Sequence, residues 1–274
     1  MEKQVDRIVS KTSNHMAPGL RSVDISNQEL TNETFLVFSD FHMERPVFGP
    51  HPHAGVSVMT YMYPDSTGAF INRDSLGDHS RILPGGVHVT QAGRGIQHDE
   101  VPEHTGTDCH GFQIWINHAD KDRLVLPQAY HADPSEIPEV VEEGVRIRII
   151  QGSYQAQQAP FKMITPISLF DISLSPGASV RLPALEMAFV YVVSGQGTAG
   201  DHTFQAQDFV LFQAAGDEVK LNAGQSGLQC MFASGTPHRE PMVFGGPFVM
   251  TTQDQMSATK KRFARGEMGE LLPL

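Results

Sequence analysis

Short β-rich runs separated by glycine and proline constrain this chain more than any other feature of its sequence. Eight runs show the alternation or the β-branched and aromatic enrichment that is typical of strands, at residues 35–38, 56–63, 110–116, 145–150, 167–174, 189–193, 209–212 and 227–232. The 274 residues include 25 Gly and 18 Pro. Together, Gly and Pro make up a larger share of this chain than their combined average of about 12% in proteins. Many short strands with turns between them predict an all-β fold built as a sandwich or barrel.

The length of the chain and a repeated strand pattern within it indicate two domains. A typical domain has roughly 100–150 residues, so this chain has room for two hydrophobic cores. The strand, turn and strand order of residues 58–86 recurs at residues 189–212, which favours a duplicated jelly-roll-type β-barrel. Residues 132–144 are acidic, contain two prolines and lack periodicity. We therefore predict a barrel at 1–131, a linker at 132–144, and a second barrel with a terminal helix at 145–274.

The terminal helix is predicted from its end signals. Thr252 and Gln255 have the spacing of a capping box, and Gly266 is a suitable stop. The basic residues 260–262 lie toward the end that the helix dipole favours for cations, so we interpret them as a solvated helix end.

Charge and composition argue against several functions and compartments. Lys and Arg number 20 against 31 Asp and Glu, a net charge of −11 that disfavours binding to nucleic acid or to anionic membranes. The first ten residues lack the apolar run of a secretory signal, and no apolar stretch approaches the length of a membrane span. We expect a cytoplasmic protein. Cys109 and Cys230 have no CxxC spacing, so we expect both thiols to be free and buried.

Two histidine-bearing pairs predict a metal site. His51 and His53 are separated by one residue, and His98 and Glu100 repeat this spacing 47 residues after His51. Because alternate side chains of a strand share a face, each pair points to one side, whereas Asp99 points away from His98. Three imidazoles and one carboxylate suit Fe, Ni, Cu, Mn or Zn rather than Ca or Mg, and iron is our first expectation.

The other ten histidines lack such pairing and receive no chemical role. A single histidine pair in a β-rich chain is more often a surface feature than a ligand set, and the metal prediction depends on the second pair. His88 and His110 lie near glycine turns, either behind the metal site or in the core. We expect the remaining eight at the surface, namely His15, His42, His79, His104, His118, His131, His202 and His238.

The chain resembles the pirin family of the cupin superfamily. The resemblance rests on motifs that occur in family order over most of the chain: His51-Pro-His-Ala-Gly55, Arg73-Asp-Ser-Leu-Gly77, Pro84-Gly-Gly86, Ala92-Gly-Arg-Gly-Ile-Gln-His-Asp-Glu100, Phe112-Gln-Ile-Trp-Ile-Asn117 and Gly246-Pro-Phe-Val-Met250. It implies a bicupin, two β-barrels in one chain, with metal only in the N-terminal barrel. The ligands it implies are His51, His53, His98 and Glu100, the set that strand parity also selects.

Two departures from the family pattern bear on the site. Cupins generally place a glutamate shortly after the histidine pair, and Ser57 stands at the corresponding position here, so Glu100 is expected to carry the carboxylate role alone. In the second barrel the corresponding strand, residues 185–188, reads Leu-Glu-Met-Ala and has no histidine pair. We expect the second barrel to be metal-free.

The resemblance implies an oxygenase. Bacterial pirin-like proteins resemble quercetin 2,3-dioxygenases, which open a flavonol ring with dioxygen, and Glu100 is then the candidate base for the flavonol hydroxyl. The partners we expect are a flavonol and dioxygen, and the protein is expected to be a monomer. The alternative is an iron-dependent sensor or transcription-cofactor-like interaction protein, as eukaryotic pirins are described. A deep aromatic cavity over the metal would favour the enzyme.

Overall fold

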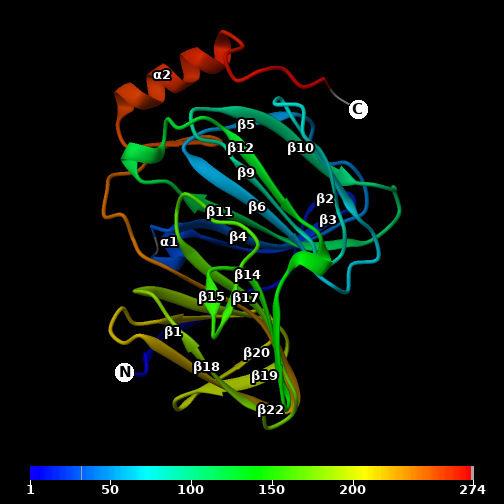
Figure 1. Ribbon diagram of the computed structural model, residues 1–274, viewed down its shortest axis with the longest axis vertical. Helices are drawn as coiled ribbons and strands as arrows, with labels where there is room; N and C mark the ends of the chain where they lie inside the picture. Colours follow the sequence, from blue (N-terminus) through cyan, green and yellow to red (C-terminus); the bar gives the residue numbers. More distant parts are fainter. Residues whose placement is uncertain (32, 273–274) are drawn as a thin grey trace. The chain divides into compact units, whose positions relative to one another are not determined.

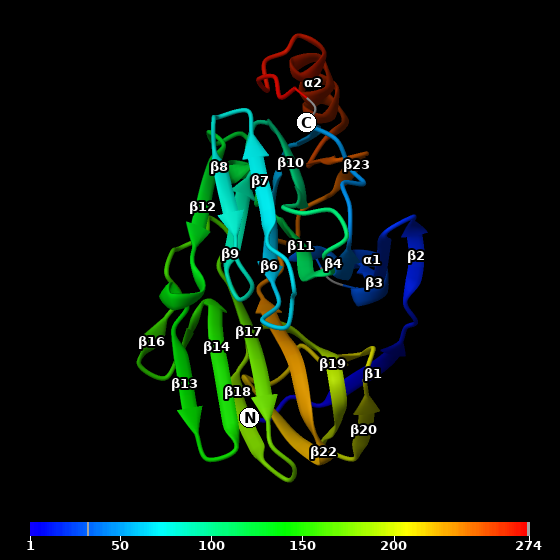
Figure 2. The same ribbon diagram turned by 90° about the vertical axis from the view of Figure 1, so that its right-hand side faces the viewer.

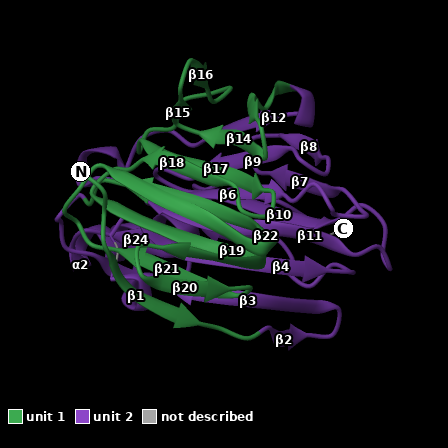
Figure 3. Ribbon diagram, turned by 90° about the horizontal axis from the view of Figure 1, so that it is seen from below, with its two compact units in different colours: residues 1–12, 136–237 green, residues 13–135, 238–274 purple. Residues whose placement is uncertain are grey.

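The chain folds into two compact units, each assembled from distant parts of the sequence (Figure 3). The computed structural model describes residues 1–31 and 33–272. Unit 1 consists of residues 1–12 and 136–237, and unit 2 of residues 13–135 and 238–274. The sequence predicts two domains that follow one another along the chain, and the two compact units differ from that division at both ends of the chain. The first strand pairs within unit 1, and the C-terminal helix belongs to unit 2.

Unit 2 contains two antiparallel sheets (Figures 1 and 2). The larger has the strand order β12-β9-β6-β11-β4-β3-β2 and the smaller the order β5-β10-β7-β8, while β23 and β24 form a hairpin. The bounds are β2 Asn14–Ala17, β3 Leu20–Ser26, α1 Asn27–Leu30, β4 Phe35–Met43, β5 His51–His53, β6 Val56–Met62, β7 Phe70–Asp74, β8 His79–Ile82, β9 Val87–Gln91, β10 Ile96–Pro102, β11 Cys109–Asn117, η1 Asp120–Asp122, β12 Gln128–Ala132, β23 Val243–Gly245, β24 Phe248–Met250 and α2 Gln253–Ala264.

Hydrophobic runs occupy the middle of the larger sheet. All seven residues of β6 are buried, and β11 pairs with β6 on one side and with β4 on the other. In this register Ile114 faces both Phe38 and Met59 across the sheet, and all three are fully buried. Because β6 is covered on both faces, it is mostly apolar and lacks regular polar alternation, with Ser57 and Thr60 as its two buried polar residues.

Unit 1 contains one nine-stranded antiparallel sheet and a small hairpin of β15 and β16. Its path is β1-β21-β19-β22-β17-β14-β13, with β18 paired to β22 and β20 to β19. The bounds are β1 Val5–Ser10, η2 Pro134–Glu136 at the junction with unit 2, β13 Glu139–Glu142, β14 Val145–Gln151, β15 Ser153–Tyr154, β16 Gln157–Gln158, β17 Ile167–Leu174, β18 Ser179–Pro183, β19 Met187–Ala199, β20 His202–Gln205, β21 Asp208–Phe212 and β22 Glu218–Gly235.

The long strand β22 lets the sheet of unit 1 wrap around its core. The N-terminal part of β22 pairs with β18, and its C-terminal part pairs with β17 and β19. The buried cluster on the inner side includes Phe170, Val190, Leu221 and Phe232. In β18 buried and exposed residues alternate strictly, the pattern of a strand with one face on a core.

The eight predicted strands are all present, but the expected linker is only partly irregular. Residues 139–142 form β13, the edge strand of the sheet in unit 1. The carboxylate of Glu139 pairs with the guanidinium groups of Arg146 and Arg148 on the neighbouring β14. The acidic composition that suggested a linker is therefore explained in part by a strand whose partner carries arginines. Composition alone does not show this pairing.

The predictions for the terminal helix and for the cysteines are confirmed. The side chain of Thr252 accepts a hydrogen bond from Gln255 N, and Gln255 reciprocates, while Met256 is buried. The basic end is less solvated than expected, because the Arg262 guanidinium donates to the carbonyl of Arg94. Both cysteines are free and buried. Within residues 1–31 and 33–272, no helix combines the length and apolar character needed to cross a membrane.

Candidate metal centre

A short antiparallel pairing brings the two predicted ligand pairs together. Strand β5 pairs with β10 so that His51 faces His98 and His53 faces Ile96. The chain turns sharply after His53 because Gly55 adopts a φ of +77° and approaches the backbone of Val249 closely. The strand parity predicted from the sequence therefore sets three histidines on one face of this pairing.

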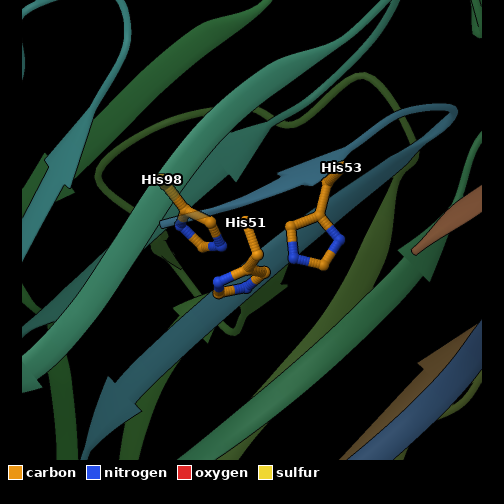
Figure 4. A group of neighbouring side chains, drawn as sticks. All are labelled: His51, His53 and His98. Atoms are coloured by element: carbon orange, nitrogen blue, oxygen red, sulfur yellow. The ribbon is translucent and has the colours of Figure 1, made fainter. Parts of the chain in front are cut away.

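The three imidazole rings of His51, His53 and His98 form a compact group (Figure 4). The distances between ring centroids are 4.9 Å for His51 and His53, 4.7 Å for His51 and His98, and 5.0 Å for His53 and His98. One ring nitrogen from each lies within 4.8 Å of the other two. Nitrogen atoms at these separations can share one ion after small side-chain rotations.

The hydrogen bonds of the rings leave nitrogens available for an ion. His51 donates from Nδ1 to the carbonyl of Gly49 at 2.9 Å, which leaves Nε2 with a lone pair. Nδ1 of His53 and Nε2 of His98 are buried and have no hydrogen-bond partner among the described residues. Buried polar atoms are nearly always satisfied, so two orphaned nitrogens in one cluster fit a bound metal ion.

Burial also keeps His53 and His98 in the neutral form that binds metals. Burial, followed by the neighbouring His51, lowers the pKa of His53 to about 3. Burial first, and then the charges of His53, His51 and His88, lowers the pKa of His98 well below its ordinary value. His98 Nδ1 lies 3.4 Å from Asn72 Oδ1, and this contact orients the ring so that Nε2 faces the other histidines.

Glu100 lies on the predicted face but outside the histidine group. It follows His98 by two residues on β10, and its side chain lines the same cavity as His51 and His53. Its Oε2 accepts a hydrogen bond from Gln113 Nε2 at 3.0 Å, and burial raises its pKa to about 7. The cluster with ligand atoms within 4.8 Å comprises the three histidines without Glu100. Asp99 points to the other face and pairs with Arg73, as strand parity predicts.

A cavity of about 460 Å³ opens onto two of the three histidines, His51 and His53. Both sheets of unit 2 contribute to its walls, and most of its lining is apolar or aromatic. The lining residues are Met16, Leu20, Ser22, Asp24, Val37, Ser39, Phe41, Met43, Phe48, His51, His53, Phe70, Glu100, Gln113, Trp115 and Pro247. Its volume lies in the range of about 300–1,000 Å³ that small-molecule sites occupy.

Several residues of the cavity were not singled out in the sequence. Trp115 packs edge-on against His53, with ring centroids 4.7 Å apart and an interplanar angle of 87°. Gln113 and Trp115 alternate along β11, so the parity of this strand could have placed both on one face. Asp24 and Ser39 lie on β3 and β4, and β3 was not predicted as a strand. Their place in the cavity depends on strand pairing that no local pattern reveals.

Ser57 does not face the cavity. It is the cross-strand partner of Ile116, which lies one position beyond Trp115 and therefore points to the opposite face of the sheet. Its hydroxyl is 2.8 Å from Nε2 of His118, and both residues are fully buried. An acid at position 57 would thus meet His118 rather than the three clustered histidines.

The surface expectation for the unassigned histidines is partly wrong. His15, His79, His104 and His202 are exposed, but His118 is fully buried, and the following three are half-buried: His42, His131 and His238. His88 and His110 are both buried. Loops and strand ends suggested exposure, yet tertiary packing covers several of them.

A second histidine and aspartate group, Asp40, His42 and His110, forms an ion-pair network. His110 bonds through Nε2 to Asp40 at 2.9 Å and through Nδ1 to Asp65 at 2.5 Å, and Nδ1 of His42 bonds to Asp108. The rings of His42 and His110 stack at 4.1 Å with an interplanar angle of 11°. Both ring nitrogens of His110 are already bonded to carboxylates, which suits ion pairing better than a shared metal.

The fold and the histidine cluster define a class of protein. Two β-barrel domains in one chain, one of them carrying convergent histidines beside a cavity, are the arrangement of a two-domain cupin. Two family models match, Pirin over residues 20–116 and the Pirin C-terminal cupin domain over residues 169–269. A pirin-like protein of Solanum lycopersicum is 31% identical over 272 residues, covering 97% of this chain and 92% of the relative. The chain belongs to the pirin family of the cupin superfamily.

Solved structures share the fold. A quercetin 2,3-dioxygenase from Acinetobacter baumannii matches with a TM-score of 0.89 at 23% identity, covering 99% of this chain and 100% of that chain. A bacterial pirin, YhhW from Escherichia coli in complex with nickel(II), matches with a TM-score of 0.65 at 18% identity, covering 84% of this chain and 100% of that chain. At these identities the likeness establishes the fold, the all-β bicupin that the sequence predicts.

Proposed function

We propose that unit 2 is a metal-dependent oxygenase site for a flavonol-like small molecule, of the quercetin 2,3-dioxygenase type. The ligands we assign are His51, His53, His98 and Glu100, with iron as the first expectation and Ni, Cu, Mn or Zn as alternatives. The observation that carries the proposal is the mainly apolar cavity, which opens directly onto two of these histidines and Glu100. We further infer that the protein is a cytoplasmic monomer.

The donor set supports a resident metal. Three clustered imidazoles with a carboxylate nearby are the ligand types of first-row transition metals, and two of the ring nitrogens are buried without partners among the described residues. Glu100 would complete the set by a change of its side-chain rotamer, since it shares the face of His98. The nickel-bound bacterial pirin supports this assignment as a structural neighbour of the same family.

The residues around the site suit the handling of an aromatic hydroxyl. When bound, the metal supplies a Lewis acid and a redox partner for dioxygen. Glu100 lines the cavity, so its carboxylate is placed to accept the proton of a flavonol hydroxyl, and the bond from Gln113 holds one oxygen in position. Phe41, Phe70 and Trp115 provide apolar surface for a planar ring system and keep water from the reacting atoms.

The cavity favours a substrate over a purely regulatory metal. A sensor or interaction protein needs a metal coupled to its surface, and a shallow polar mouth would serve that purpose. Here the lining is mostly apolar and includes three phenylalanines and Trp115. The name of the structural neighbour from Acinetobacter baumannii supports flavonols as the first substrates to test.

The ligand assignment is tested by metal retention. Protein purified without chelators is analysed for metal by mass spectrometry, together with the His53→Ala and His79→Ala variants. His79 is exposed and outside the cluster, so its variant is the matched control. We expect about one metal per chain in the wild type and in His79→Ala, and near-complete loss in His53→Ala. Retention of metal by His53→Ala at wild-type stoichiometry would contradict the assignment.

The activity is tested with each metal separately. Protein loaded with Fe, Ni, Cu, Mn or Zn is incubated with quercetin under air, while flavonol absorbance and carbon monoxide are measured. We expect both loss of absorbance and release of carbon monoxide with at least one metal, and neither with His53→Ala. Absence of both signals with every metal refutes the flavonol oxygenase.

A further inference from the structure

A row of polar side chains crosses the larger sheet of unit 2 beneath the cavity. Asp24 on β3 pairs with Ser39 on β4, and Ser39 pairs with Gln113 on β11. Directly paired residues of neighbouring strands project to the same face of a sheet, and all three side chains line the cavity. Most of their neighbours in the lining are apolar, so this row is the main polar track along that wall.

The two ends of the row have different surroundings. At one end Gln113 donates to Glu100, which lines the cavity together with the histidines. At the other end the carboxylate of Asp24 accepts hydrogen bonds from the hydroxyls of Ser22 at 2.6 Å and Ser39 at 2.5 Å. Neighbouring strands lie about 4.8 Å apart, so Asp24 stands roughly 10 Å along the row from Gln113. This is the scale of a molecule with two or three aromatic rings.

Asp24 retains hydrogen-bonding capacity toward the cavity. An ionised carboxylate accepts about four hydrogen bonds, and the two serine hydroxyls each occupy one position on a different oxygen. The serines thereby fix the plane of the carboxylate, as a rigid acceptor requires. A ligand that covers Asp24 with an apolar group removes water from the carboxylate without replacing the hydrogen bonds to water. This loss disfavours binding.

We propose that Asp24, held by Ser22 and Ser39, is a specificity-determining residue that accepts a hydrogen bond from a hydroxyl at the end of the substrate remote from the histidines. The inference deepens the proposed function, on which it rests, by naming the substrate class. That class is aromatic molecules of two or three rings with one hydroxyl for the metal end and a second for Asp24. Flavonols that lack the remote hydroxyl are poorer ligands.

The test compares ligands with and without the remote hydroxyl. Quercetin carries hydroxyls on its outer rings, whereas 3-hydroxyflavone keeps only the hydroxyl proposed to meet the metal. Dissociation constants are measured without oxygen by fluorescence for the metal-containing wild type and for the Asp24→Asn and Asp24→Leu variants. Asp201→Asn, at an exposed loop position in unit 1, is the matched control. Metal content and circular dichroism are recorded for every variant.

The expected result is a selective loss of affinity. Wild type and Asp201→Asn bind quercetin at least tenfold more tightly than 3-hydroxyflavone. Asp24→Leu loses about ten- to hundredfold in quercetin affinity with little change for 3-hydroxyflavone, the size expected when a buried hydrogen bond to a charged acceptor is removed. Asp24→Asn gives an intermediate loss. When the wild type binds both flavonols, equal weakening of both ligands by Asp24→Leu, or no weakening of either, overturns the proposal.

A second probe pair separates this inference from the flavonol hypothesis. The same measurements are made with 2-naphthol and 2,6-dihydroxynaphthalene, whose two hydroxyls lie at opposite ends of a fused ring system. If flavonols neither bind nor react but the wild type prefers the dihydroxy compound and Asp24→Leu loses that preference, the assignment of Asp24 holds and the flavonol function fails. Absence of any Asp24-dependent preference in both pairs overturns the assignment of Asp24.

Discussion

The substitution Gly55→Ala probes how the turn after His53 is held. Gly55 has a φ of +77°, and a Cβ atom there would lie 1.9 Å from the carbonyl oxygen of Val249. Real Cβ contacts are not shorter than 3.0 Å, so the two segments would have to separate by about 1.1 Å. The obstacle is backbone, which cannot rotate aside as the end of a flexible side chain can.

Hydrogen bonds around Gly55 oppose that separation. Arg123 Nη1 donates to the carbonyl oxygens of both Gly55, at 3.0 Å, and Val249, at 2.9 Å, and Val249 N donates to Ala54 O at 3.0 Å. Loss of one or two of these buried bonds costs about 1–3 kcal/mol. The left-handed backbone adds about 1–2 kcal/mol for alanine. We therefore expect Gly55→Ala to lower the free energy of unfolding by about 2–5 kcal/mol.

The matched control is Gly106→Ala. Gly106 lies in the same compact unit and has a φ of +93°, and no atom lies within 4 Å of the position that a Cβ atom would take there. Only the backbone penalty of about 1–2 kcal/mol is expected for this variant. A loss of about 1 kcal/mol lowers the melting temperature of a unit of this size by about 2–4 °C. Differential scanning calorimetry should therefore show a fall of roughly 4–20 °C for Gly55→Ala and roughly 2–8 °C for Gly106→Ala.

Gly55→Ala should also weaken metal binding by the histidine cluster. Gly55 follows His53 by two residues, so separating Ala54 from Val249 displaces the His53 ring from its partners. We expect the affinity for added Ni²⁺, measured by isothermal titration calorimetry, to fall at least tenfold in Gly55→Ala and to stay unchanged in Gly106→Ala. Equal melting temperatures for the two variants would refute the steric argument.

Two further predictions concern buried charges. Arg123 is fully buried and donates hydrogen bonds to four acceptors. In chemical denaturation, Arg123→Met should therefore lower the free energy of unfolding by about 4 kcal/mol or more. The control is Arg181→Met at an exposed ion pair, for which we expect a loss of less than about 1 kcal/mol. Burial disfavours protonation of His110, but the hydrogen bonds and charges of Asp40 and Asp65 outweigh it and raise its pKa. The stability that protonated His110 contributes is therefore present below its ordinary pKa and lost as pH rises through the raised value, by about 1.4 kcal/mol per unit of pKa difference. The stability difference between wild type and His110→Gln should shrink from pH 6 to pH 9, and a difference that grows with pH would contradict this.

The strands and the histidine cluster were predictable because they depend on local geometry. Alternation along a strand places His51 with His53 and His98 with Glu100 whatever the rest of the fold does. The capping box of the C-terminal helix is equally local, since Thr252 and Gln255 are three residues apart. Strand alternation also places Glu100 on the same face as His98. Its carboxylate, however, accepts a hydrogen bond from Gln113 and lies outside the histidine group.

The division of the chain was less predictable from the sequence. Residues 1–12 complete the sheet of unit 1 by pairing β1 with β21, about two hundred residues away. The C-terminal segment returns to unit 2, where Val249 bonds to Ala54. Such pairings are chosen by backbone hydrogen bonds and side-chain packing across the whole chain, which a window of residues does not contain. The strand at 139–142 likewise depends on its pairing with β14.

The sequence by itself determined an all-β chain with two barrels and one set of three histidines, because turn residues and strand parity act over a few residues. Only the tertiary structure decided that a cavity lies beside His51 and His53, that Ser57 faces away from it, and that Asp24 and Ser39 line its wall. These features arise where strands distant in sequence share a sheet or face one another across a core. The types of metal ligand can thus be read from short stretches of sequence, whereas the shape of the substrate cavity depends on the whole fold.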